Sequence, residues 1–370
     1  MKSVGIICEY NPFHNGHIYH INKIKEMFPD SVIILVMSGS FTQRGDASII
    51  NKWNKTKIAL NHNIDLVIEL PFIFTNQSAD TFAFGACSIL NYLKVDYLVF
   101  GSESDNIDYI KDIVNIEDDK KYQEKVKKLL DNGINYPTAL SKALKDFNIN
   151  LSDSSNDLLG ISYVKALKKL NSKITPITIK RTNNYNDKTL TKYITSATSI
   201  RENINKRNIK KYIPKDTYKC LKEKKYFIED YYQLLKYKIM SEINDLNKYN
   251  DVNEGIENRI KKVIYESNSY DELIMNIKSK RYTYSKIKRI LLNILVGFTK
   301  EDKEKNKEIS YIRVLGFNKN GKNYLNKIKK ECNVPIYTNF NKDLEYELKV
   351  TSIYDESLIK EEIKNIIICD

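Results

Sequence analysis

Strand-length apolar runs alternate with helix-length amphipathic segments over the first 200 residues, and this alternation restricts the possible folds more than any other feature. The first helix is expected to follow the loop 9–15 and to end near Met27. Strands separated by helices pair in parallel through right-handed crossovers. The sequence therefore predicts an α/β fold with a Rossmann-like doubly wound parallel sheet. The expected strands are Ser3–Cys8, Ser31–Met37, Asp65–Leu70, Asp96–Phe100 and Ile174–Lys180.

The pattern changes at about residue 206, where helical periodicity replaces the alternation. Polar links separate five expected helices, and a mixed strand–helix segment follows Ile309. We expect two domains, an α/β domain over residues 1–205 and a mainly helical, basic domain over residues 206–370. The expected helices of the second domain are Thr217–Lys225, Asp230–Leu246, Asn253–Glu266, Tyr270–Lys278 and Lys286–Leu295.

The formal charge of +13 is distributed unevenly along the chain. Residues 201–370 hold 36 basic and 26 acidic side chains, a net +10, against +3 for residues 1–200. Frequent Asn, Lys, Ile and Tyr indicate a codon bias that inflates the lysine count, but such a bias does not explain the uneven distribution. A nearly neutral first half and a basic second half favour a polyanionic partner for the second half.

Composition and cysteine usage exclude several classes of protein. Hydrophobic residues make up 42% of the chain and charged residues 29%, which excludes wholesale disorder. The sequence contains no apolar run of the ~20 residues that a membrane span needs, and its N-terminus does not resemble a signal peptide. Five widely spaced cysteines without a CxxC pair argue against a disulfide framework. We therefore expect a cytoplasmic protein without membrane association.

Three of the four histidines, His14, His17 and His20, lie within seven residues of each other, in and just after the segment EYNPFHNGH between the first expected strand and helix. The carboxyl end of a strand brings such a loop to the ligand-binding edge of a doubly wound sheet. The following helix offers free N–H groups and its positive dipole end to an anion. Gly16 allows close approach of a nucleotide, and imidazoles three residues apart can face one phosphate. The motif predicts nucleotide binding.

Zinc binding is the alternative interpretation of this histidine cluster. It requires a third strong ligand, for which His62 and Glu9 are weak candidates. No metal site built from protein side chains is therefore expected.

HxGH at this position resembles the signature of the nucleotidyltransferase superfamily, which also includes class I aminoacyl-tRNA synthetases. The superfamily carries a second signature, ISSTxxR, at the start of a helix after its last strand. The segment TSATSIR lies there and keeps Ser196, Thr198 and Arg201. Hydroxyls at a helix N-terminus cap the helix and bind phosphate, and an arginine neutralises the β and γ phosphates. An ordinary Ser/Thr-rich N-cap is the alternative.

Longer segments resemble one family within this superfamily. VGIICEYNPFHNGHIYHI, VMSGSFTQRGDASIINKWNKTKIAL, DLVIELPFIFTNQSADTFAFGA, LVFGSE, SNDLLGISYVKAL and ITSATSIR together resemble the bacterial tRNA-Met cytidine acetate ligase family. The resemblance covers most of residues 1–201 and continues more loosely through RVLGFNKNG. It implies an HxGH-type nucleotidyltransferase fold and a ligase that converts acetate and ATP into acetyl-adenylate. The acetyl group would then pass to the N4 amine of the wobble cytidine of elongator tRNA-Met, giving N4-acetylcytidine.

The resemblance also implies the site residues. His14 and His17 would stabilise charge on the α-phosphate, and pyrophosphate would leave towards Ser196, Thr198 and Arg201, with Mg²⁺. One departure from the family pattern is Asp157, where asparagine is commoner. The expected nucleotide-binding residues are Ile7, Cys8, Glu9, Tyr10, Asn11, Pro12, Phe13, His14, Asn15, Gly16, His17, Ile18, Tyr19, His20, Gly101, Asn156 and Arg181.

A basic stretch in the second half is the expected tRNA contact. It holds six basic and no acidic residues, with Tyr282 and Tyr284 between them. Cations bind phosphates and aromatic rings stack on bases, as RNA binding requires. A solvated helix face is the alternative, and residues 206–211 hold a second basic patch. The expected RNA-binding residues are Lys278, Lys280, Arg281, Lys286, Lys288 and Arg289.

Two other functions stay open on the residues alone. A small-molecule adenylyltransferase would share the HxGH motif, but such enzymes are usually much shorter than 370 residues. A non-catalytic RNA-binding protein on the same scaffold would not need intact His14, His17 and Arg201. The sequence implies no protein partner.

Overall fold

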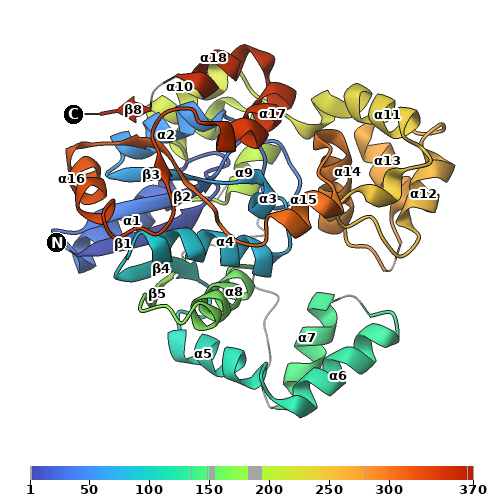
Figure 1. Cartoon of the computed structure of the whole chain (residues 1–370), viewed down its shortest axis with the longest axis horizontal. Helices are drawn as coiled ribbons and strands as arrows, with labels where there is room; N and C mark the ends of the chain where they lie inside the picture. The colour runs from blue at the N-terminus through green and yellow to red at the C-terminus, as the bar shows by residue number, and fades with distance from the viewer. Residues whose placement is uncertain are drawn as a thin grey trace.

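A computed structural model describes residues 2–134, 136–147, 149, 155–181, 194–279, 281–364 and 366–369, without the side chains of residues 136, 137, 155 and 207. The described residues form one sheet in the order β5-β4-β1-β2-β3-β6-β7, with β8 paired to β6 (Figure 1). The strands are β1 Ser3–Cys8, β2 Val32–Ser38, β3 Leu66–Leu70, β4 Tyr97–Ser102, β5 Thr175–Lys180, β6 Ile312–Phe317, β7 Ile336–Tyr337 and β8 Ile367–Ile368.

The five strands expected from the sequence are present, and they pair in parallel. β1 lies between β2 and β4, and its pairing with β2 runs without interruption from Ser3–Val32 to Cys8–Met37. β3 extends the sheet beyond β2, and β5 extends it beyond β4. The predicted doubly wound α/β sheet is confirmed. Because the strand order reverses at β1, a crevice opens at the carboxyl ends of β1 and β4, where folds of this kind bind ligands.

The central strands are apolar at nearly every position because helices cover both faces of the sheet. In β2, Ile34 and Val36 pack into one core cluster, whereas Ile33 and Leu35 pack into the other. Successive side chains of a strand point to opposite faces, so a strand buried on both faces shows a continuous apolar run. The helices α4 Ala79–Tyr92 and α8 Ser155–Lys169 contribute to the first cluster, and α1 Asn15–Met27 and α2 Lys52–Asn61 to the second.

The remaining helices of the first half are short or lie at its edge. α6 and α7 pack on each other at a distance from the sheet (Figure 1). These helices are α3 Phe72–Thr75, α5 Ile107–Ile116, α6 Lys120–Asp131, α7 Tyr136–Lys145 and α9 Ala197–Glu202. α10 Lys215–Glu223 follows the predicted domain boundary and packs against α2.

Four of the five predicted helices of the second half form a bundle with its own core, whereas the first, Thr217–Lys225, corresponds to α10 and packs against α2 instead. Leu235, Ile260, Leu273 and Leu291 are fully buried there, and Phe41, from the loop after β2, belongs to the same cluster. The bundle therefore packs on the carboxyl edge of the sheet rather than standing apart from it (Figure 1). Its helices are α11 Tyr232–Ser241, α12 Ile256–Val263, α13 Tyr270–Ile277 and α14 Tyr284–Val296.

The last 60 residues return to the sheet. The predicted strand–helix segment after Ile309 is present as β6 and α16, and β6 pairs antiparallel with β3, from Leu66–Phe317 to Glu69–Arg313. This pairing joins residues about 250 positions apart, and it leaves no local signal in the sequence. The domain boundary near residue 205 stays a prediction, but residues on both sides of it build the same sheet. The remaining helices are α15 Lys300–Lys305, α16 Lys319–Ile328, α17 Glu345–Tyr354 and α18 Ile359–Ile363.

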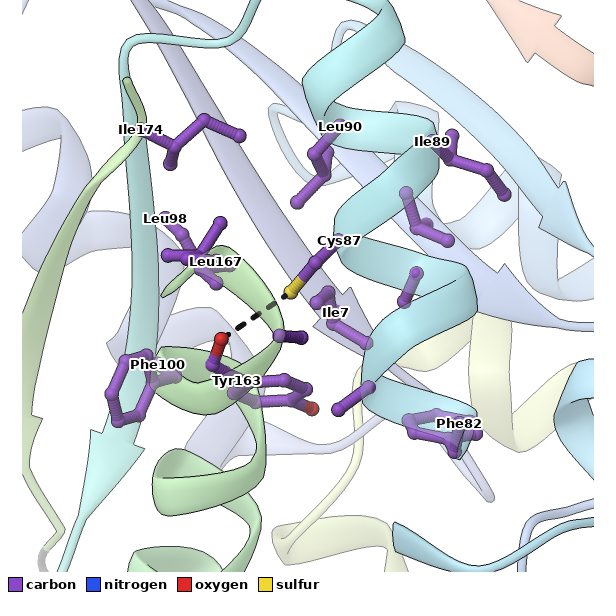
Figure 2. Close-up of a cluster of buried hydrophobic side chains, with 14 of the residues drawn as sticks. Ile7, Phe82, Cys87, Ile89, Leu90, Leu98, Phe100, Tyr163, Leu167 and Ile174 are labelled. Carbon is purple, nitrogen blue, oxygen red and sulfur yellow. Dashed lines mark hydrogen bonds between the residues drawn. The ribbon is translucent and has the colours of Figure 1, made fainter. Parts of the chain in front are cut away.

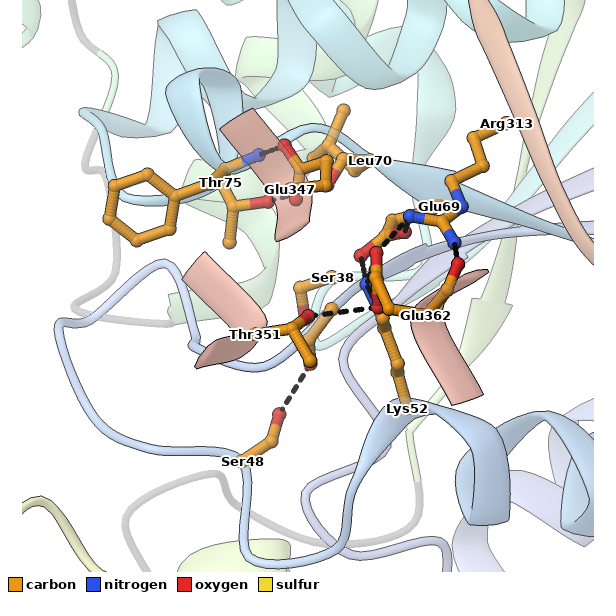
Figure 3. Close-up of polar contacts among 12 residues, drawn as sticks. Ser38, Ser48, Lys52, Glu69, Leu70, Thr75, Arg313, Glu347, Thr351 and Glu362 are labelled. Atoms are coloured by element: carbon orange, nitrogen blue, oxygen red, sulfur yellow. Dashed lines mark hydrogen bonds and ion pairs between the residues drawn. The ribbon is translucent and has the colours of Figure 1, made fainter. Parts of the chain in front are cut away.

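A buried ionic network fastens this returning segment (Figure 3). Lys52 of α2 donates to Glu69 of β3 at 2.7 Å and to Glu362 of α18 at 3.0 Å. Arg313 of β6 pairs with the Glu362 carboxylate and donates to its carbonyl oxygen at 3.0 Å. None of these four side chains is more than 5% exposed. Charges at this depth are tolerated only when they are paired, so four elements are held in one arrangement.

An apolar cluster fixes α4 against α8 below the crevice (Figure 2). The Cys87 thiol of α4 lies 3.9 Å from the Tyr163 carbonyl oxygen of α8, and Phe100 packs edge-on against the Tyr163 ring. Ile7 of β1 lies beside them, and Phe82 is on the same face of α4 as Cys87. This packing determines where the aromatic rings at the base of the crevice stand. Within the described part of the chain, the helices all fall short of the length and apolarity needed to cross a membrane.

Candidate active site

A cavity of about 370 Å³ lies at the carboxyl ends of β1, β4 and β5. Most of the predicted nucleotide-binding and catalytic residues surround it. Pro12, Phe13, Asn15, Ile18 and Thr198 do not line it. The predicted residues that do are Ile7, Cys8, Glu9, Tyr10, Asn11, His14, Gly16, His17, Tyr19, His20, Gly101, Asn156, Arg181, Ser196 and Arg201.

His14 and His17 form a capping box at the start of α1. His14 is the N-cap residue, and its Nδ1 accepts a hydrogen bond from the Gly16 N–H at 3.0 Å. The Nδ1 of His17, three residues later, accepts from the His14 N–H at 3.1 Å. Two imidazoles thus take the places of the usual Ser/Thr and Glu side chains. The spacing HxxH is therefore the spacing of a helix cap, and it stacks the two rings with centroids 3.9 Å apart.

The capping geometry fixes the protonation of both rings. Burial, with the charges of Arg181 and Arg201 adding to it, lowers the pKa of His14 to about 3. Burial and the neighbouring His14 likewise hold the pKa of His17 well below its usual value. A neutral imidazole carries one proton, and since each Nδ1 accepts a backbone N–H, that proton is on Nε2. Each ring therefore offers an Nε2–H donor, which is suited to a phosphate oxygen.

The loop that carries the histidines is held in an unusual conformation. Tyr10 has a φ of 49°, in the left-handed region that non-glycine residues rarely adopt. At Gly16, a Cβ would stand 2.8 Å from Cε1 of His14, so only glycine leaves room for that ring. The Asn11 amide oxygen accepts from the Ile49 N–H at 2.7 Å, and Asn15 donates to the Lys211 carbonyl at 2.9 Å. These asparagines position the loop from either end.

The second predicted motif begins α9. Ser196 is its N-cap residue and accepts from the Ser199 N–H at 3.0 Å, as predicted for a helix start. Arg201 donates to the Asn11 carbonyl oxygen at 2.6 Å and to the Thr198 hydroxyl at 3.2 Å. The structure therefore brings the two motifs, 180 residues apart in the sequence, to one wall of the cavity. Thr198 contributes by orienting the guanidinium rather than by lining the cavity.

The third group of predicted residues lies at the ends of β4 and β5 and at the start of α8. Arg181 donates to the Asn156 amide oxygen at 3.3 Å, and the Asn156 amide donates to the Glu103 carboxylate. Asp157 is 1% exposed and accepts from the backbone N–H groups of Glu103 and Ser104. A carboxylate accepts several N–H bonds at once, whereas an asparagine would offer one oxygen only, and this explains the departure from the family pattern.

Sequence reasoning missed several residues of the cavity. Phe82, Phe100 and Tyr163 form apolar wall, and Thr42 and Gln43 reach it from the loop after β2. The aromatic residues look like ordinary core positions of α4, β4 and α8, so the sequence carries no signal for them. The loop after β2 could have been found from the sequence, because a long polar segment that follows a buried strand lies at the ligand-binding edge of the sheet.

Lys55 of α2 ties that loop to the histidine loop. Its Nζ lies within 3.1 Å of the carbonyl oxygens of Glu9, Ser38 and Gly39 and of the Ser48 hydroxyl. Lys55 is 1% exposed, and burial lowers its pKa to about 7. The amine substitutes for backbone partners that these loops lack, since buried carbonyl groups need a donor.

The predicted RNA-binding residues lie at the start of α14 and just before it. Arg281 and Lys286 both contact Glu254, at 3.2 and 3.5 Å, and Lys288 contacts Asp46 at 2.7 Å. Lys278 donates to two backbone carbonyl groups. The backbone of Arg289 meets the loop after β2, since a Cβ at Gly45 would stand 2.6 Å from its nitrogen. Lys280 lies outside the described residues.

The two tyrosines between these cations differ in exposure. Tyr282 is 3% exposed and donates to the Glu254 carbonyl oxygen, so it is a core residue and cannot stack on a base. Tyr284 is 49% exposed, so its ring is accessible for stacking on a base. The described residues contain no cluster of three His, Cys, Asp or Glu side chains that could hold a metal ion. His62, the fourth histidine, pairs instead with Asp216 at 3.2 Å.

The fold and the pair of capping imidazoles define a nucleotidyltransferase of the HxGH class. Consistent with this, the HIGH nucleotidyl transferase family model matches residues 1–366. A tRNA(Met) cytidine acetate ligase of Clostridium novyi is 42% identical to the chain, over 98% of the chain and 96% of that protein. The corresponding ligase of Caldicellulosiruptor bescii is 43% identical over 89% of the chain and 85% of its own length. The chain belongs to the tRNA(Met) cytidine acetate ligase family.

Two solved structures from Thermotoga maritima agree with this assignment. The apo form of TmcAL superposes with a TM-score of 0.92, covering 100% of this chain and 99% of that one, at 30% identity. A second form, bound with α-thio ATP, superposes with a TM-score of 0.90 at the same identity and coverage.

Proposed function

We propose that this protein activates acetate with ATP as acetyl-adenylate and transfers the acetyl group to the N4 amine of the wobble cytidine of elongator tRNA(Met). Membership of the ligase family supports the overall reaction, and the α-thio ATP complex of the Thermotoga protein supports ATP as the nucleotide. The observation that carries the proposal is the capping box, because it presents two Nε2–H donors to a cavity that also contains Arg201.

Adenylate formation follows from the chemistry of these groups. An acetate oxygen attacks the α-phosphorus in line, and negative charge grows on the phosphate oxygens. The Nε2–H groups of His14 and His17 stabilise that charge as neutral donors fixed before the reaction starts. Pyrophosphate leaves towards Arg201 and the N-terminus of α9, where Ser196 is the cap.

The adenosine end of ATP is assigned to the opposite part of the cavity. Asn156 offers a donor and an acceptor there, and Arg181 offers a cation. Gly101 lies near the carboxyl end of β4, where its backbone lines the cavity. Mg²⁺ enters this proposal as the companion of ATP, since the described residues provide no carboxylate cluster to hold it. Phosphate and water oxygens then supply most of its ligands.

The tRNA is assigned to the bundle face around α14. Arg281 is exposed and Lys286 is partly exposed, and the loop that contacts α14 also lines the cavity, so a tRNA bound there is next to the acetyl-adenylate. All five cysteines are free thiols, which supports a reducing compartment such as the cytoplasm.

A single assay tests the overall reaction. The full chain is incubated with ATP, labelled acetate and total tRNA, and label is followed into RNA. We expect incorporation that requires acetate and ATP but not acetyl-CoA, and that is confined to one tRNA. Pyrophosphate exchange driven by another carboxylic acid or by a small nucleotide, without labelled RNA, would instead indicate a different enzyme of this superfamily.

The tRNA surface has its own prediction. Replacing Arg281 and Lys286 together by alanine removes two phosphate contacts, so tRNA affinity should fall and the slope of log affinity against log salt should drop by about 1 to 2. Lys329 and Lys330, exposed next to α16 at the far edge of the sheet, provide the control pair. Equal salt slopes for the two double variants, measured by filter binding, would contradict the assignment.

A further inference from the structure

Acetyl transfer releases a proton, and the proposed function does not say which group accepts it. The cytidine N4 attacks the acetyl carbonyl carbon, a nitrogen–carbon bond forms, and the bond from that carbon to the AMP oxygen breaks. The electron pair leaves with AMP. The amine must lose one of its two protons to become the neutral amide, so a base near the carbonyl carbon accelerates the step. The inference below rests on the proposed function.

The histidines of the cavity are unsuited to this task. His14 and His17 hold their protons on Nε2 and commit both Nδ1 lone pairs to backbone N–H groups, so neither ring offers a free lone pair to the cavity. The Nε2 of His20 is enclosed and not accessible from the cavity. Burial raises the pKa of the Cys8 thiol to about 12 and the pKa of the Tyr163 phenol well above its usual value, so both keep their protons.

Glu9 is the carboxylate that remains. It is the first residue after β1, and its Oε1 accepts a hydrogen bond from the Gln43 N–H at 2.6 Å. Lys55 holds the Glu9 backbone from below through its carbonyl oxygen. Glu9 lines the cavity. The other acidic lining residue, Asp46, already pairs with Lys288 at 2.7 Å.

The position of Glu9 also fits the direction from which the tRNA must come. The sheet order puts β4 and β5 on one side of β1, with Arg181 just after β5 and Asn156, in the first turn of α8, hydrogen-bonded to it. β2 and its loop lie on the other side, and the loop residue Gln43 holds the Glu9 carboxylate. The same loop touches α14, the helix of the proposed tRNA surface. The carboxylate is thus on the cytidine side of the cavity and not on the adenosine side.

We propose that Glu9 is a further catalytic residue, whose carboxylate takes the proton from the cytidine amine as the acetyl group is transferred. Its surroundings make it a stronger base than a free carboxylate. Burial raises the pKa of Glu9, and three cations from three elements moderate that rise. The charged and titratable groups that face it are Arg44 of the loop after β2, Lys55 of α2, Arg201 of α9, Tyr163 of α8 and the adjoining Cys8.

The test separates the two half-reactions in Glu9→Gln, an isosteric change that keeps an oxygen for the Gln43 N–H. Because Glu9 also lines the nucleotide cavity, acetate-dependent exchange between ATP and pyrophosphate is the reference for each variant, and no rise in KM for acetate is expected, because a negative charge has been removed and not added. Single-turnover transfer from preformed acetyl-adenylate to tRNA should fall about 10²-fold or more beyond any loss of exchange. The wild-type transfer rate should decline as the pH falls through the pKa of Glu9, and the variant should lack that decline.

Two further variants make the outcome decisive. Glu9→Asp keeps the charge, but its side chain is one methylene shorter and the carboxylate lies closer to the backbone. Transfer should therefore slow less than in Glu9→Gln and should keep its pH dependence. Glu103→Gln, on the adenosine side, should show the opposite pattern. It should raise KM for ATP in the exchange reaction and affect acetyl transfer less. Wild-type transfer by Glu9→Gln, or an equal loss in both half-reactions, would overturn the assignment. A wild-type protein without acetate-dependent exchange would overturn the proposed function itself, whatever Glu9 does.

Discussion

His14 and His17 show how one pair of side chains serves local structure and chemistry together. Their Nδ1 atoms cap the first helix, and their Nε2–H groups are left to contact phosphate. In the proposed mechanism both rings are neutral, so fixed hydrogen-bond donors rather than cations would stabilise the transition-state charge. This arrangement requires glycine at position 16, where a Cβ would meet the His14 ring.

Replacement of His17 by alanine is the direct test at the residue scale. Loss of one fixed donor should lower acetate-dependent pyrophosphate exchange by about 10²- to 10³-fold. Affinity for tRNA should stay within about twofold, since the proposed tRNA surface is on another element. The same two measurements on His62→Ala, a histidine outside the cavity, provide the control. Loss of tRNA affinity together with exchange in His17→Ala alone would show that the ring is mainly structural.

The buried histidines also predict a pH dependence of stability. The pKa is about 3 for His14 and about 4 for His20, whereas both are near 6.5 in an unfolded chain. Between these values the unfolded chain binds more protons than the folded one, so the free energy of unfolding should fall as the pH drops from 6.5 towards 4. Each such histidine contributes up to about 1.4 kcal/mol per pH unit.

The variant His20→Gln isolates one of these groups. Denaturant unfolding at several pH values should show a shallower fall between pH 6.5 and 4.5 for the variant than for the wild type. Contributions from carboxylates are common to both proteins and cancel in the comparison. Parallel stability curves would mean that His20 is protonated in the folded state.

At the scale of elements, the loop between β2 and α2 connects the cavity to the bundle. Gln43 of this loop holds Glu9, and Asp46 pairs with Lys288 of α14. Gly45 lies between them with a φ of 81°, and its backbone lies against the backbone at residues 288 and 289. A loop fixed at both ends in this way keeps the predicted tRNA-binding helix in a constant position relative to the cavity.

Alanine at position 45 should separate these two elements. A Cβ there would stand 2.6 Å from the Arg289 nitrogen, and backbone cannot move aside cheaply. Gly255→Ala is a matched control, because Gly255 has nearly the same φ, 82°, but open space around its Cβ position. Overpacking should cost Gly45→Ala about 1–3 kcal/mol beyond the control. Its acetyl transfer to tRNA should also fall more than its pyrophosphate exchange, and equal unfolding free energies of the two variants would contradict this.

At the scale of the whole molecule, the chain closes on itself through its last 60 residues. β6 joins the sheet next to β3, and Glu362 of α18 binds Lys52 and Arg313 in the interior. Along the sequence, the bundle therefore lies between two groups of strands that belong to the same sheet. This closure holds the bundle at the carboxyl edge, next to the cavity (Figure 1).

Removal of the central charge of this network should destabilise the whole protein. Glu362→Gln leaves two buried cations with one fewer anion, and breaking a buried pair in this way costs about 3–5 kcal/mol. Among the described residues, the neighbouring Glu361 has one ion pair, with Lys364 at the surface, so Glu361→Gln should change stability by less than about 1 kcal/mol. Urea unfolding of both variants measures the difference, and similar midpoints would show that the network is dispensable.

The sequence by itself determined the parallel sheet, the position of the HxGH loop, the start of α9 and the helices of the bundle. These features depend on local periodicity, on caps and on breaks, which a single chain displays directly. The same local information placed Ser196 at a helix N-terminus and His14 at a strand-to-helix junction.

Only the tertiary structure decided which distant groups share the site. The contact between Arg201 and Asn11, the aromatic wall around Tyr163 and the return of β6 to the sheet all depend on long-range packing. Such contacts leave no periodic signal, because a cavity-lining aromatic residue and a core residue obey the same pattern. The tertiary structure likewise buried Tyr282 and paired Lys288 with Asp46, so a uniformly basic stretch in the sequence became a surface with only some of its cations available.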